Sequence, residues 1–386
     1  MKFPWTTSLL ALALTAIAVS KSTAAEKHSH STAFVEAIDE TLLQTRLRAL
    51  ELPVSIRFTP SVQSFISEFT TNGRKGSEAM LGRTVLYFPA FEFYLNLYGL
   101  PSQLKYLPMV ESNLSPNVVS EAGAAGLWQL MTTTAQQYGL HVNTYVDERH
   151  DPTRSTEAAV RYLADLFKQF GTWELALAAY NCGPGNVQKA IRSGGSKDFW
   201  QIREFLPAQT QVYVPRFIAA AYLAEYYSKH GLQPAFPEYD LRFSRTIKVF
   251  SQLPLSKLAS ITGVSISVIR KLNPAFRQGI IPASTRGHYL TLPELGIMAF
   301  QDYLRWSGND VIKTDLVSAQ QKESLDAKGG TTVLVEAGDS IESIAGKHGC
   351  TKYEIMEWNR LQGENLYFRQ ELILFVTSAN STARKA

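Results

Sequence analysis

Apolar residues recur three and four positions apart over the first part of the chain, from about residue 32 to residue 100. This spacing places apolar side chains on one face of a helix, as in the sets Val35, Ile38, Leu42, Leu43 and Val62, Phe65, Ile66, Phe69. Asn72-Gly73 and Lys75-Gly76 indicate a break between two helices. Gly99 is expected to end the second helix, which passes through Phe91 and Tyr98.

Helical spacing continues from Pro101 to about His230, and no alternating pattern of a strand interrupts it. Ser155 is expected to cap a helix that stops at Gly171. The stretch therefore predicts an all-α domain, which we place at residues 59–235, after an N-terminal linker or helical extension at 26–58. Further helices are expected through Leu104 to Val110, Thr132 to Tyr138, Trp173 to Tyr180 and Tyr213 to Lys229.

The C-terminal third changes character and contains an internal repeat with an offset of 86 positions. A shared offset through several positions indicates two copies of one small unit. Each copy predicts the order strand, helix, helix, strand, at residues 243–295 and 331–377, with a polar linker at 307–330 and a tail at 378–386. The chain is thus expected to be mainly α, with two small βααβ units at its end. The matched pairs include Val249 with Val335, Leu258 with Ile344, Gly263 with Gly349 and Asn273 with Asn359.

The composition is that of a globular protein, since hydrophobic residues make up 45% and charged residues 19% of the 386 positions. The net charge of +4 suits an anionic envelope polymer but is too small to predict nucleic-acid binding. Cys182 and Cys350 are most simply two separate thiols, the alternative being a disulfide. His28 and His30 have no further ligands around them, so no metal site and no cofactor are expected.

The N-terminus has the layout of a secretory signal peptide. Lys2 supplies a positive charge, Ser8 to Val19 is an apolar run of 12 residues, and small residues follow up to Ala25. The run is too short for a transmembrane helix. We expect residues 1–25 to be a signal peptide that directs export, with cleavage near Ala24 or Ala25; the alternative is an uncleaved N-terminal anchor.

The candidate chemistry is concentrated between Leu104 and Met131. Glu111 follows an apolar run at the end of a predicted helix, among Tyr106, Met109 and Trp128. Desolvation by such neighbours disfavours the ionised carboxyl and raises its pKa, as a general acid needs near neutral pH. The alternative is an ordinary solvated carboxylate at a helix end.

Two further side chains are candidates for binding a sugar. Gln129 follows the turn at residues 123–126 and is expected either to hydrogen-bond a sugar substituent or to satisfy a buried loop carbonyl. Tyr180 precedes a tight turn at residues 181–186 and is expected either to donate to Glu111 or to pack at the edge of the core.

Four short motifs follow one another along this part of the chain: Glu111-Ser112, Gly126-Leu127-Trp128-Gln129, Ala179-Tyr180-Asn181-Cys182-Gly183 and the run from Gln209 to Arg216. In this order they resemble the motifs of the family 1 lytic transglycosylases. The resemblance extends from about residue 59 to residue 376 and implies a goose-type lysozyme-like catalytic domain, a peptidoglycan substrate, and Glu111 as catalytic acid and then base. It also implies that Ser112 contacts the N-acetyl group of the sugar, and that Gln129, Tyr180, Asn181 and Tyr213 line the glycan groove. The alternatives are a helix-end hydroxyl for Ser112 and a packing contact for Tyr213.

The resemblance implies a reaction that needs one carboxylate, where ordinary glycosidases use two. Glu111 would protonate the oxygen between N-acetylmuramic acid and N-acetylglucosamine, and the muramoyl 6-hydroxyl would attack intramolecularly to give a 1,6-anhydro sugar. Asp147, Glu148 and Asp151, beside Arg149, are expected to form structural ion pairs and helix caps. The alternatives are a lysozyme-type hydrolase of the same polymer and a non-catalytic wall-binding protein.

The two C-terminal units resemble LysM domains, which bind glycans that contain N-acetylglucosamine. The first has Leu253-Pro254 where the second has Asp339-Ser340, so the first is expected to be degenerate. A lipoprotein member of the family has a lipid-modified Cys after its signal, and this chain has no Cys there, which favours a soluble periplasmic protein. Peptidoglycan strands are the expected partner, with peripheral association with the wall or membrane, and the protein is expected to be a monomer.

Overall fold

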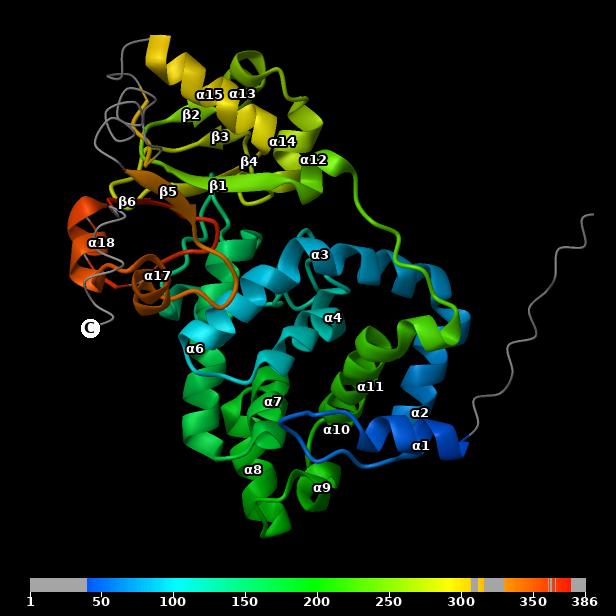
Figure 1. Cartoon of the computed structure of the whole chain (residues 1–386). Helices are drawn as coiled ribbons and strands as arrows, with labels where there is room; N and C mark the ends of the chain where they lie inside the picture. The colour runs from blue at the N-terminus through cyan, green and yellow to red at the C-terminus, as the bar shows by residue number, and fades with distance from the viewer. Residues whose placement is uncertain are drawn as a thin grey trace, which may run out of the picture. The chain divides into compact units, whose positions relative to one another are not determined.

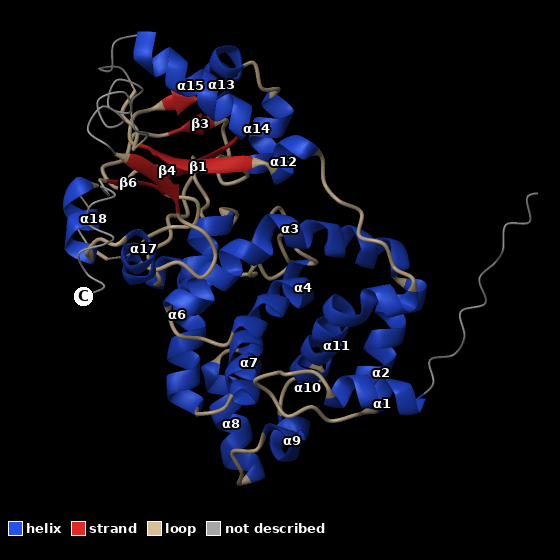
Figure 2. Ribbon diagram, viewed as in Figure 1, coloured by secondary structure: helices blue, strands red, loops and turns tan. Residues whose placement is uncertain are grey.

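A computed structural model describes residues 40–306, 312–315, 330–359, 361, 363–364 and 366–375 (Figures 1 and 2). The predicted signal peptide at 1–25, most of the predicted linker at 307–330 and the predicted tail at 378–386 lie outside these residues. Within the described ranges, no helix is both long enough and apolar enough to cross a membrane.

Helices, with a few isolated bridges, build the described chain from Glu40 to Arg242, which confirms the predicted helical character of this part of the chain. The first of them, α1, belongs to the predicted N-terminal extension and buries Leu43 and Leu47. The helices are α1 (Glu40–Arg48), α2 (Pro60–Ser67), α3 (Arg74–Leu97), α4 (Leu107–Ser112), α5 (Thr132–Gln137), α6 (Pro152–Phe170), α7 (Trp173–Cys182), α8 (Pro184–Gly194), α9 (Phe199–Ile202), α10 (Ala208–Gln211), α11 (Tyr213–Tyr226) and α12 (Tyr239–Arg242).

The break before α3 lies earlier than one of the two predicted signals. A wide helical turn at Glu68–Asn72 separates α2 from α3, and α3 then runs straight through Lys75-Gly76. The Ser77 hydroxyl donates to the Phe69 carbonyl at 2.8 Å. This bond ties the new helix to the turn, so the glycine is carried inside a helix that its packing stabilises.

The start of α6 also differs from the prediction, since Asp151 and not Ser155 is its capping residue. The Asp151 carboxylate accepts hydrogen bonds from the backbone N–H groups of Thr153 at 2.8 Å and Arg154 at 2.9 Å. Pro152 then occupies the first helical position, where its missing N–H costs nothing. Ser155 lies inside the helix and donates to the Asp151 carbonyl at 2.6 Å.

The core of the helical domain surrounds α11 and the buried indole of Trp128. α11 packs against α2, α4 and α7. Trp128 meets Phe91 of α3 edge-on, with ring centroids 5.0 Å apart, and donates its N–H to the Thr156 hydroxyl of α6 at 2.9 Å. These contacts hold the short helix α4, which carries Glu111, beside α11 (Figure 1).

The first C-terminal unit joins short strands to three helices. β1 (Ser244–Val249) pairs antiparallel with β4 (His288–Pro293), and β2 (Leu253–Pro254) pairs with β3 (Ile280–Ile281). α13 (Leu255–Thr262) and α14 (Ile266–Leu272) lie between them in sequence, and α15 (Glu294–Trp306) follows β4. The unit therefore continues beyond its predicted end at residue 295, because Ile297, Phe300 and Leu304 of α15 are buried in its core.

The second C-terminal unit has the predicted order β5 (Thr331–Leu334), α17 (Ile341–His348), α18 (Lys352–Trp358) and β6 (Glu371–Leu374), with β5 antiparallel to β6. The repeat is also visible in its hydrogen bonds. Asn273 donates to the Ile269 carbonyl at 2.8 Å and accepts from the Thr291 N–H at 2.7 Å, and Asn359 makes the same pair of bonds at 2.8 and 2.6 Å. The mainly α fold with two small strand and helix units is thus confirmed.

Both C-terminal units contact the helical domain, and the described residues belong to one compact unit. Val146 forms a backbone bridge with Phe276 of the first unit. Phe93 of α3 packs on Phe368 of the second unit, with ring centroids 6.3 Å apart. Residues 312–315, from the predicted linker, lie along the end of β1. Figure 2 shows that the strands are confined to these two units.

Candidate active site

Glu111 lies in the last turn of α4. Asn113 and Leu114, with φ angles of 50° and 58°, take the left-handed conformation directly after it and end the helix. The Arg83 guanidinium of α3 donates to the Asn113 carbonyl at 2.8 Å. A positive charge is favourable at the carboxyl end of a helix, so this bond fixes to α3 the helix end that carries Glu111.

The Glu111 carboxyl is half-buried and accepts a hydrogen bond from the Tyr213 hydroxyl, at the start of α11. Burial raises the pKa of Glu111 to about 7, against the hydrogen bond from Tyr213 and the charge of Arg216, which both lower it. The desolvation predicted from its sequence neighbours is therefore present. Near neutral pH this carboxyl populates both its protonated and its ionised form.

Arg216 is a member of the site that sequence reasoning missed. It lies one turn after Tyr213 on α11, and its guanidinium lies over the ring of Phe65 at 5.5 Å from the ring centroid. Its Nε is buried and has no hydrogen-bond partner among the described residues. Tyr213 and Arg216 are three positions apart on a predicted helix, a spacing that places both side chains on one face. This spacing is the sequence signal that could have identified Arg216.

Tyr180 does not hold Glu111, which corrects one of its two predicted roles. Its hydroxyl donates to the Trp128 carbonyl at 2.7 Å, because a backbone carbonyl in this buried turn needs a donor. Tyr213 takes the place beside the carboxyl instead. Burial and then the negative charge of Glu111 raise the pKa of Tyr180, so this phenol stays neutral near the acid.

Gln129 and Ser112 support the turn at residues 123–130. Gln129, with φ of 46°, donates through Nε2 to the Gly126 carbonyl at 2.9 Å. Ser112 is only 4% exposed, and its hydroxyl donates to the Leu127 carbonyl at 2.8 Å. These bonds favour the structural alternative for each residue, and their contact with a sugar stays a prediction.

Asn181 lies at the end of α7, where its side-chain oxygen accepts a hydrogen bond from the Thr210 hydroxyl at 2.7 Å. Of the two tyrosines, Tyr213 contacts Glu111 directly. Burial first, and then the negative charge of Glu111, raise the pKa of both Tyr180 and Tyr213. Such a site presents one carboxyl of high pKa and neutral hydroxyl donors. It can give a proton to a substrate oxygen and later take one back.

Asp147 belongs to the acidic cluster that was predicted to be structural, and its contacts confirm this. It is fully buried and accepts two hydrogen bonds from Arg149, each 2.9 Å long. Burial alone would raise the pKa of Asp147, but Arg149, His150 and Arg277 together outweigh burial and lower it. Arg149 also donates to the Gly123 carbonyl at 2.7 Å, so the cluster holds the turn behind the site.

Glu148 is 2% exposed and accepts hydrogen bonds from the Arg286 guanidinium and, at 2.6 Å, from the His141 N–H. Burial alone would raise the pKa of Glu148, but His288, His141 and Arg286 outweigh burial and lower it to about 2. Arg286 and His288 belong to the first C-terminal unit, as does the Arg277 that pairs with Asp147. These two carboxylates therefore attach that unit to the helical domain, a link between residues 130 and 138 positions apart that no local pattern reveals.

Asp151 completes the cluster as the cap of α6. Burial raises the pKa of Asp151 to about 6, against the N–H groups of Arg154 and Thr153 that lower it. Among the described residues, no three His, Cys, Asp or Glu side chains are grouped so as to hold a metal ion. No disulfide joins Cys182 to Cys350.

Arg286→Gln is expected to lower the free energy of unfolding by about 1–3 kcal/mol at pH 7, because Glu148 stays ionised and buried with less compensation. The pKa of Glu148 in the folded chain lies below its ordinary value of 4.5. The stabilisation is therefore present above about pH 4.5 and is lost as the pH falls toward 2. Urea unfolding should show the difference at pH 7 and a smaller one at pH 3. The exposed Arg270→Gln, in the same unit, is the control, and an equal loss in both variants would contradict this attachment.

Three family models match parts of the chain. Residues 92–203 match the transglycosylase SLT domain, residues 244–306 match the LysM-like domain of lytic transglycosylase MltD, and residues 333–375 match the LysM domain. Glu111 and Tyr180 fall within the first match, and Tyr213 lies just beyond it. The second match ends at residue 306, which is also the last residue of α15.

Several known proteins are similar to parts of the chain. Membrane-bound lytic murein transglycosylase D of Escherichia coli K12 is 31% identical over 292 residues, which are 74% of this chain and 62% of that protein, so the chain spans less than two thirds of its relative. Membrane-bound lytic murein transglycosylase F of Maricaulis maris is 36% identical over 110 residues, which are 25% of this chain and 23% of that protein. Among solved structures, the 70 kDa soluble lytic transglycosylase of Escherichia coli is 25% identical, with 45% of this chain and 32% of that one covered and a TM-score of 0.33.

Proposed function

We propose that this chain, which belongs to the family of proteins with a transglycosylase SLT domain, is a lytic transglycosylase of peptidoglycan. It would cleave the β-1,4 bond between N-acetylmuramic acid and N-acetylglucosamine and leave a 1,6-anhydro ring on the muramoyl sugar. The observation that carries the proposal is the half-buried Glu111, with its pKa raised to about 7 and the Tyr213 hydroxyl bound to it.

In the first step Glu111 acts as the acid. Its proton passes to the glycosidic oxygen, the bond from that oxygen to the muramoyl C1 breaks, and N-acetylglucosamine leaves with a hydroxyl group. The oxygen of the substrate's own N-acetyl group takes up the positive charge at C1. Glu111 is then ionised, and the Tyr213 hydrogen bond and the Arg216 charge stabilise that form, since both lower the pKa of the carboxyl.

In the second step the same carboxylate acts as the base. It takes the proton of the muramoyl 6-hydroxyl while that oxygen forms the new bond to C1, and the N-acetyl group is released. The proton given in the first step is thereby returned to Glu111, and no water is consumed. Because the attacking hydroxyl is part of the substrate, its effective concentration is very high.

The other buried carboxylates already have structural partners, which supports a reaction with a single acid. Asp147 and Glu148 are held in ion pairs with Arg149 and Arg286, and Asp151 caps α6. A lysozyme-type hydrolase needs a second carboxylate to activate water or to attack the sugar. These acidic side chains are committed to structure, which favours the intramolecular reaction over hydrolysis.

We further propose that the second C-terminal unit binds the wall, and that the protein is exported to the periplasm and acts as a monomer on peptidoglycan. In this unit Asp339 accepts from the Glu336 N–H at 3.0 Å and pairs with Lys347 at 2.5 Å, which builds a polar turn before α17. The first unit has Leu253 and Pro254 there, in a strand paired with β3. Its attachment to Asp147 and Glu148 suggests a supporting role in place of glycan binding.

Mass spectrometry of the products from purified protein and isolated sacculi tests the proposal. We expect muropeptides that end in 1,6-anhydro sugars. Free reducing ends would identify a lysozyme-type hydrolase. Retention of the protein on sacculi without release of muropeptides would identify a wall-binding protein and contradict the catalytic proposal.

Tyr213→Phe is expected to move the pH dependence of cleavage. The variant lacks the hydrogen bond that lowers the pKa of Glu111, so the acid should stay protonated to higher pH. The alkaline limb of the kcat/KM profile should shift to higher pH by up to about one unit, because a neutral hydrogen bond is worth about 0.5–1.5 kcal/mol. Tyr98→Phe, which removes a phenol bound to Glu157 on α6, is the control and should keep the wild-type profile. A limb that moves to lower pH would contradict the assignment.

A further inference from the structure

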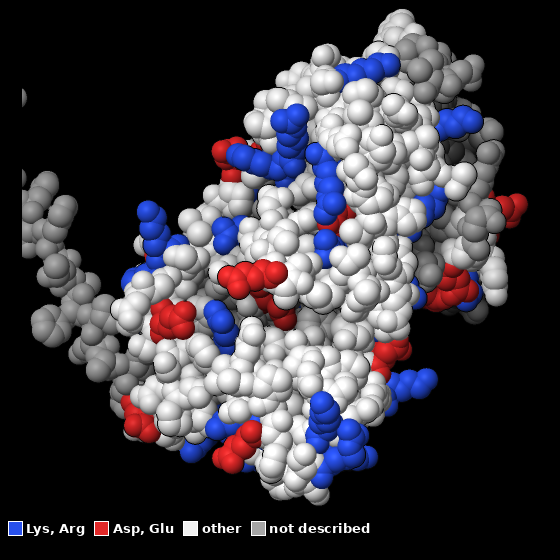
Figure 3. Space-filling model, turned by 180° about the vertical axis from the view of Figure 1, so that it is seen from behind, with Lys and Arg blue, Asp and Glu red and all other residues white. Residues whose placement is uncertain are grey.

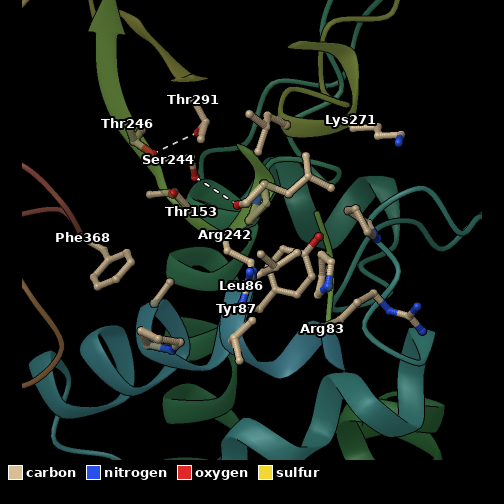
Figure 4. A pocket seen from close by; sticks show the side chains of 18 of the residues that line it. Arg83, Leu86, Tyr87, Thr153, Arg242, Ser244, Thr246, Lys271, Thr291 and Phe368 are labelled. Carbon is tan, nitrogen blue, oxygen red and sulfur yellow. Dashed lines mark hydrogen bonds between the residues drawn. The ribbon is translucent and has the colours of Figure 1, made fainter. Parts of the chain in front are cut away.

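A pocket of about 380 Å³ lies between the helical domain and the first C-terminal unit (Figure 4). α3 and the start of α6 line one side, and β1, β4 and the end of α14 line the other. Glu111, Tyr180 and Tyr213 are not among its lining residues, so it is separate from the candidate active site. Its volume suits a small molecule or a few residues of a peptide.

The charged side chains that line this pocket are all positive: Arg83, Arg242, Lys271 and Arg369. Their partners within the described residues compensate this charge only in part. Arg83 donates to the Asn113 carbonyl, and Lys271 lies 3.8 Å from the exposed Glu238. The Nε of Arg242 is buried without a hydrogen-bond partner among the described residues.

The pKa values of Arg83 and Arg369 also indicate that the positive charge of this pocket is not fully compensated. Burial lowers the pKa of Arg83. Burial also lowers the pKa of Arg369, and the nearby Glu336 and Glu294 oppose this without reversing it. A buried cation without a full counter-charge is costly. A ligand that brings negative charge into this pocket would remove part of that cost.

The rest of the lining is apolar or carries hydroxyl groups. Leu86, Pro89 and Phe368 present apolar surface. Figure 4 shows the Tyr87 hydroxyl directed into the space between α3 and the strands. Thr246 and Thr291 already bond each other at 2.9 Å. The pocket therefore offers positive charge and apolar contact, with few polar groups left over for a neutral sugar.

A second hollow, of about 670 Å³, continues from the pocket and shares Asn117 and Lys271 with it. Arg270 is a further cation on its lining, while Arg277, which also lines it, is already paired with Asp147. No Asp or Glu lines either hollow. Figure 3 shows that basic and acidic side chains both occur on the upper part of the rear face. Two neighbouring hollows lined by basic and not by acidic side chains suit an extended ligand with several negative groups better than a single small anion.

We propose that the pocket and the adjoining hollow bind a short peptide with several carboxylates. The carboxylates would pair with Arg242, Lys271 and Arg270, and small side chains would pack on Leu86 and Phe368. Peptidoglycan carries such peptides on its muramoyl sugars, so the natural ligand is its stem peptide; this last identification rests on the proposed function. The site lies beside the Arg83 bond that fixes the helix end after Glu111.

Calorimetric titration of the full chain with the free tetrapeptide stem, released from peptidoglycan by an amidase, tests the proposal. We expect binding to the wild-type chain, and binding at least tenfold weaker to the double variant Arg242→Gln/Lys271→Gln. The same peptide with its carboxyl groups converted to amides should also bind at least tenfold more weakly. Lys189→Gln, an exposed lysine of α8 outside both hollows, is the matched control and should bind like the wild type. Thermal unfolding of each variant confirms that it is folded.

Absence of binding to the wild type, equal binding by the double variant, or equal binding of the amidated peptide would each overturn the proposal. Binding of the folded chain to vesicles of anionic phospholipid, lost in the double variant while the peptide does not bind, would assign the two hollows to a membrane instead and also overturn it. Cleavage of peptide-free glycan strands by the wild type is measured alongside. Cleaved strands without peptide binding refute the peptide site alone, and peptide binding without cleavage refutes the proposed function alone.

Discussion

Replacing Glu111 by glutamine is expected to lower the rate of glycan cleavage at least about a thousandfold. A positioned general acid or base contributes about 10²–10⁴ to a rate, and in the proposed reaction this one side chain serves in both steps. Glutamine keeps the size of the side chain and can still accept a hydrogen bond from Tyr213, but it has no acidic proton to give. The measurement is release of muropeptides from isolated sacculi.

The matched control for this variant is Glu225→Gln. Glu225 lies on α11 and accepts a hydrogen bond from the Tyr106 phenol, so it repeats the carboxyl and phenol pair away from the candidate site. This control should release muropeptides at close to the wild-type rate. If Glu111→Gln released them as fast as the control, Glu111 would not be the acid.

The variant Glu111→Gln should also gain stability relative to the wild type as the pH rises. The pKa of Glu111 in the folded chain, about 7, lies above its ordinary value of 4.5. The contribution of the carboxyl to stability is therefore fully present below pH 4.5 and is lost as the pH rises through 7. Glutamine does not titrate, so between pH 4.5 and pH 8 the variant should gain on the order of 1–3 kcal/mol over the wild type. A constant difference across this range would mean that the carboxyl is not desolvated.

Gly126→Ala is expected to lower the free energy of unfolding by more than about 4 kcal/mol, or to prevent folding, as severe backbone clashes do. Gly126 has φ of 82°, and a Cβ there would lie 1.8 Å from the Arg149 carbonyl oxygen. Neither Arg149 nor the turn that contains Gly126 can move freely to relieve this clash. Arg149 is bonded to the buried Asp147, and the turn after Gly126 carries the carbonyls that Ser112 and Tyr180 bind.

Gly123→Ala is the control that separates the clash from backbone strain. Gly123 has nearly the same φ, 85°, but a Cβ there would meet no atom within 4 Å. Its replacement should cost only the strain of a left-handed residue, about 1–2 kcal/mol. Urea unfolding of the two variants compares these costs directly. Equal losses would show that the Gly126 backbone does not lie against Arg149.

The parts of the fold and site that depend on local patterns could be predicted from the sequence. The helical spacing located the all-α domain, and the offset repeat located both C-terminal units down to the equivalent asparagines Asn273 and Asn359. The raised pKa of Glu111 followed from an apolar run that lies directly before it. In each case the residues that decide the outcome are close in the sequence or belong to a repeated pattern.

The parts that depend on long-range packing could not be predicted. Tyr213 binds Glu111 across 102 positions, in the place that the sequence analysis offered to Tyr180, and only the packing of α11 on α4 reveals this contact. The attachment of Asp147 and Glu148 to the first C-terminal unit depends on arginines far along the chain. The prediction of a helix break at Lys75-Gly76 was wrong for a related reason, since tertiary packing outweighs the low helix propensity of a single glycine.

Titration of the Glu111 carboxyl itself tests most directly whether this side chain is the catalytic acid. In the full chain with carbon-13 at the side-chain carboxyls of glutamate, the signal missing from Glu111→Gln identifies this group in the NMR spectrum. We expect this signal to titrate with a midpoint near pH 7, and a midpoint near the ordinary value of 4.5 would contradict the role of Glu111 as the acid.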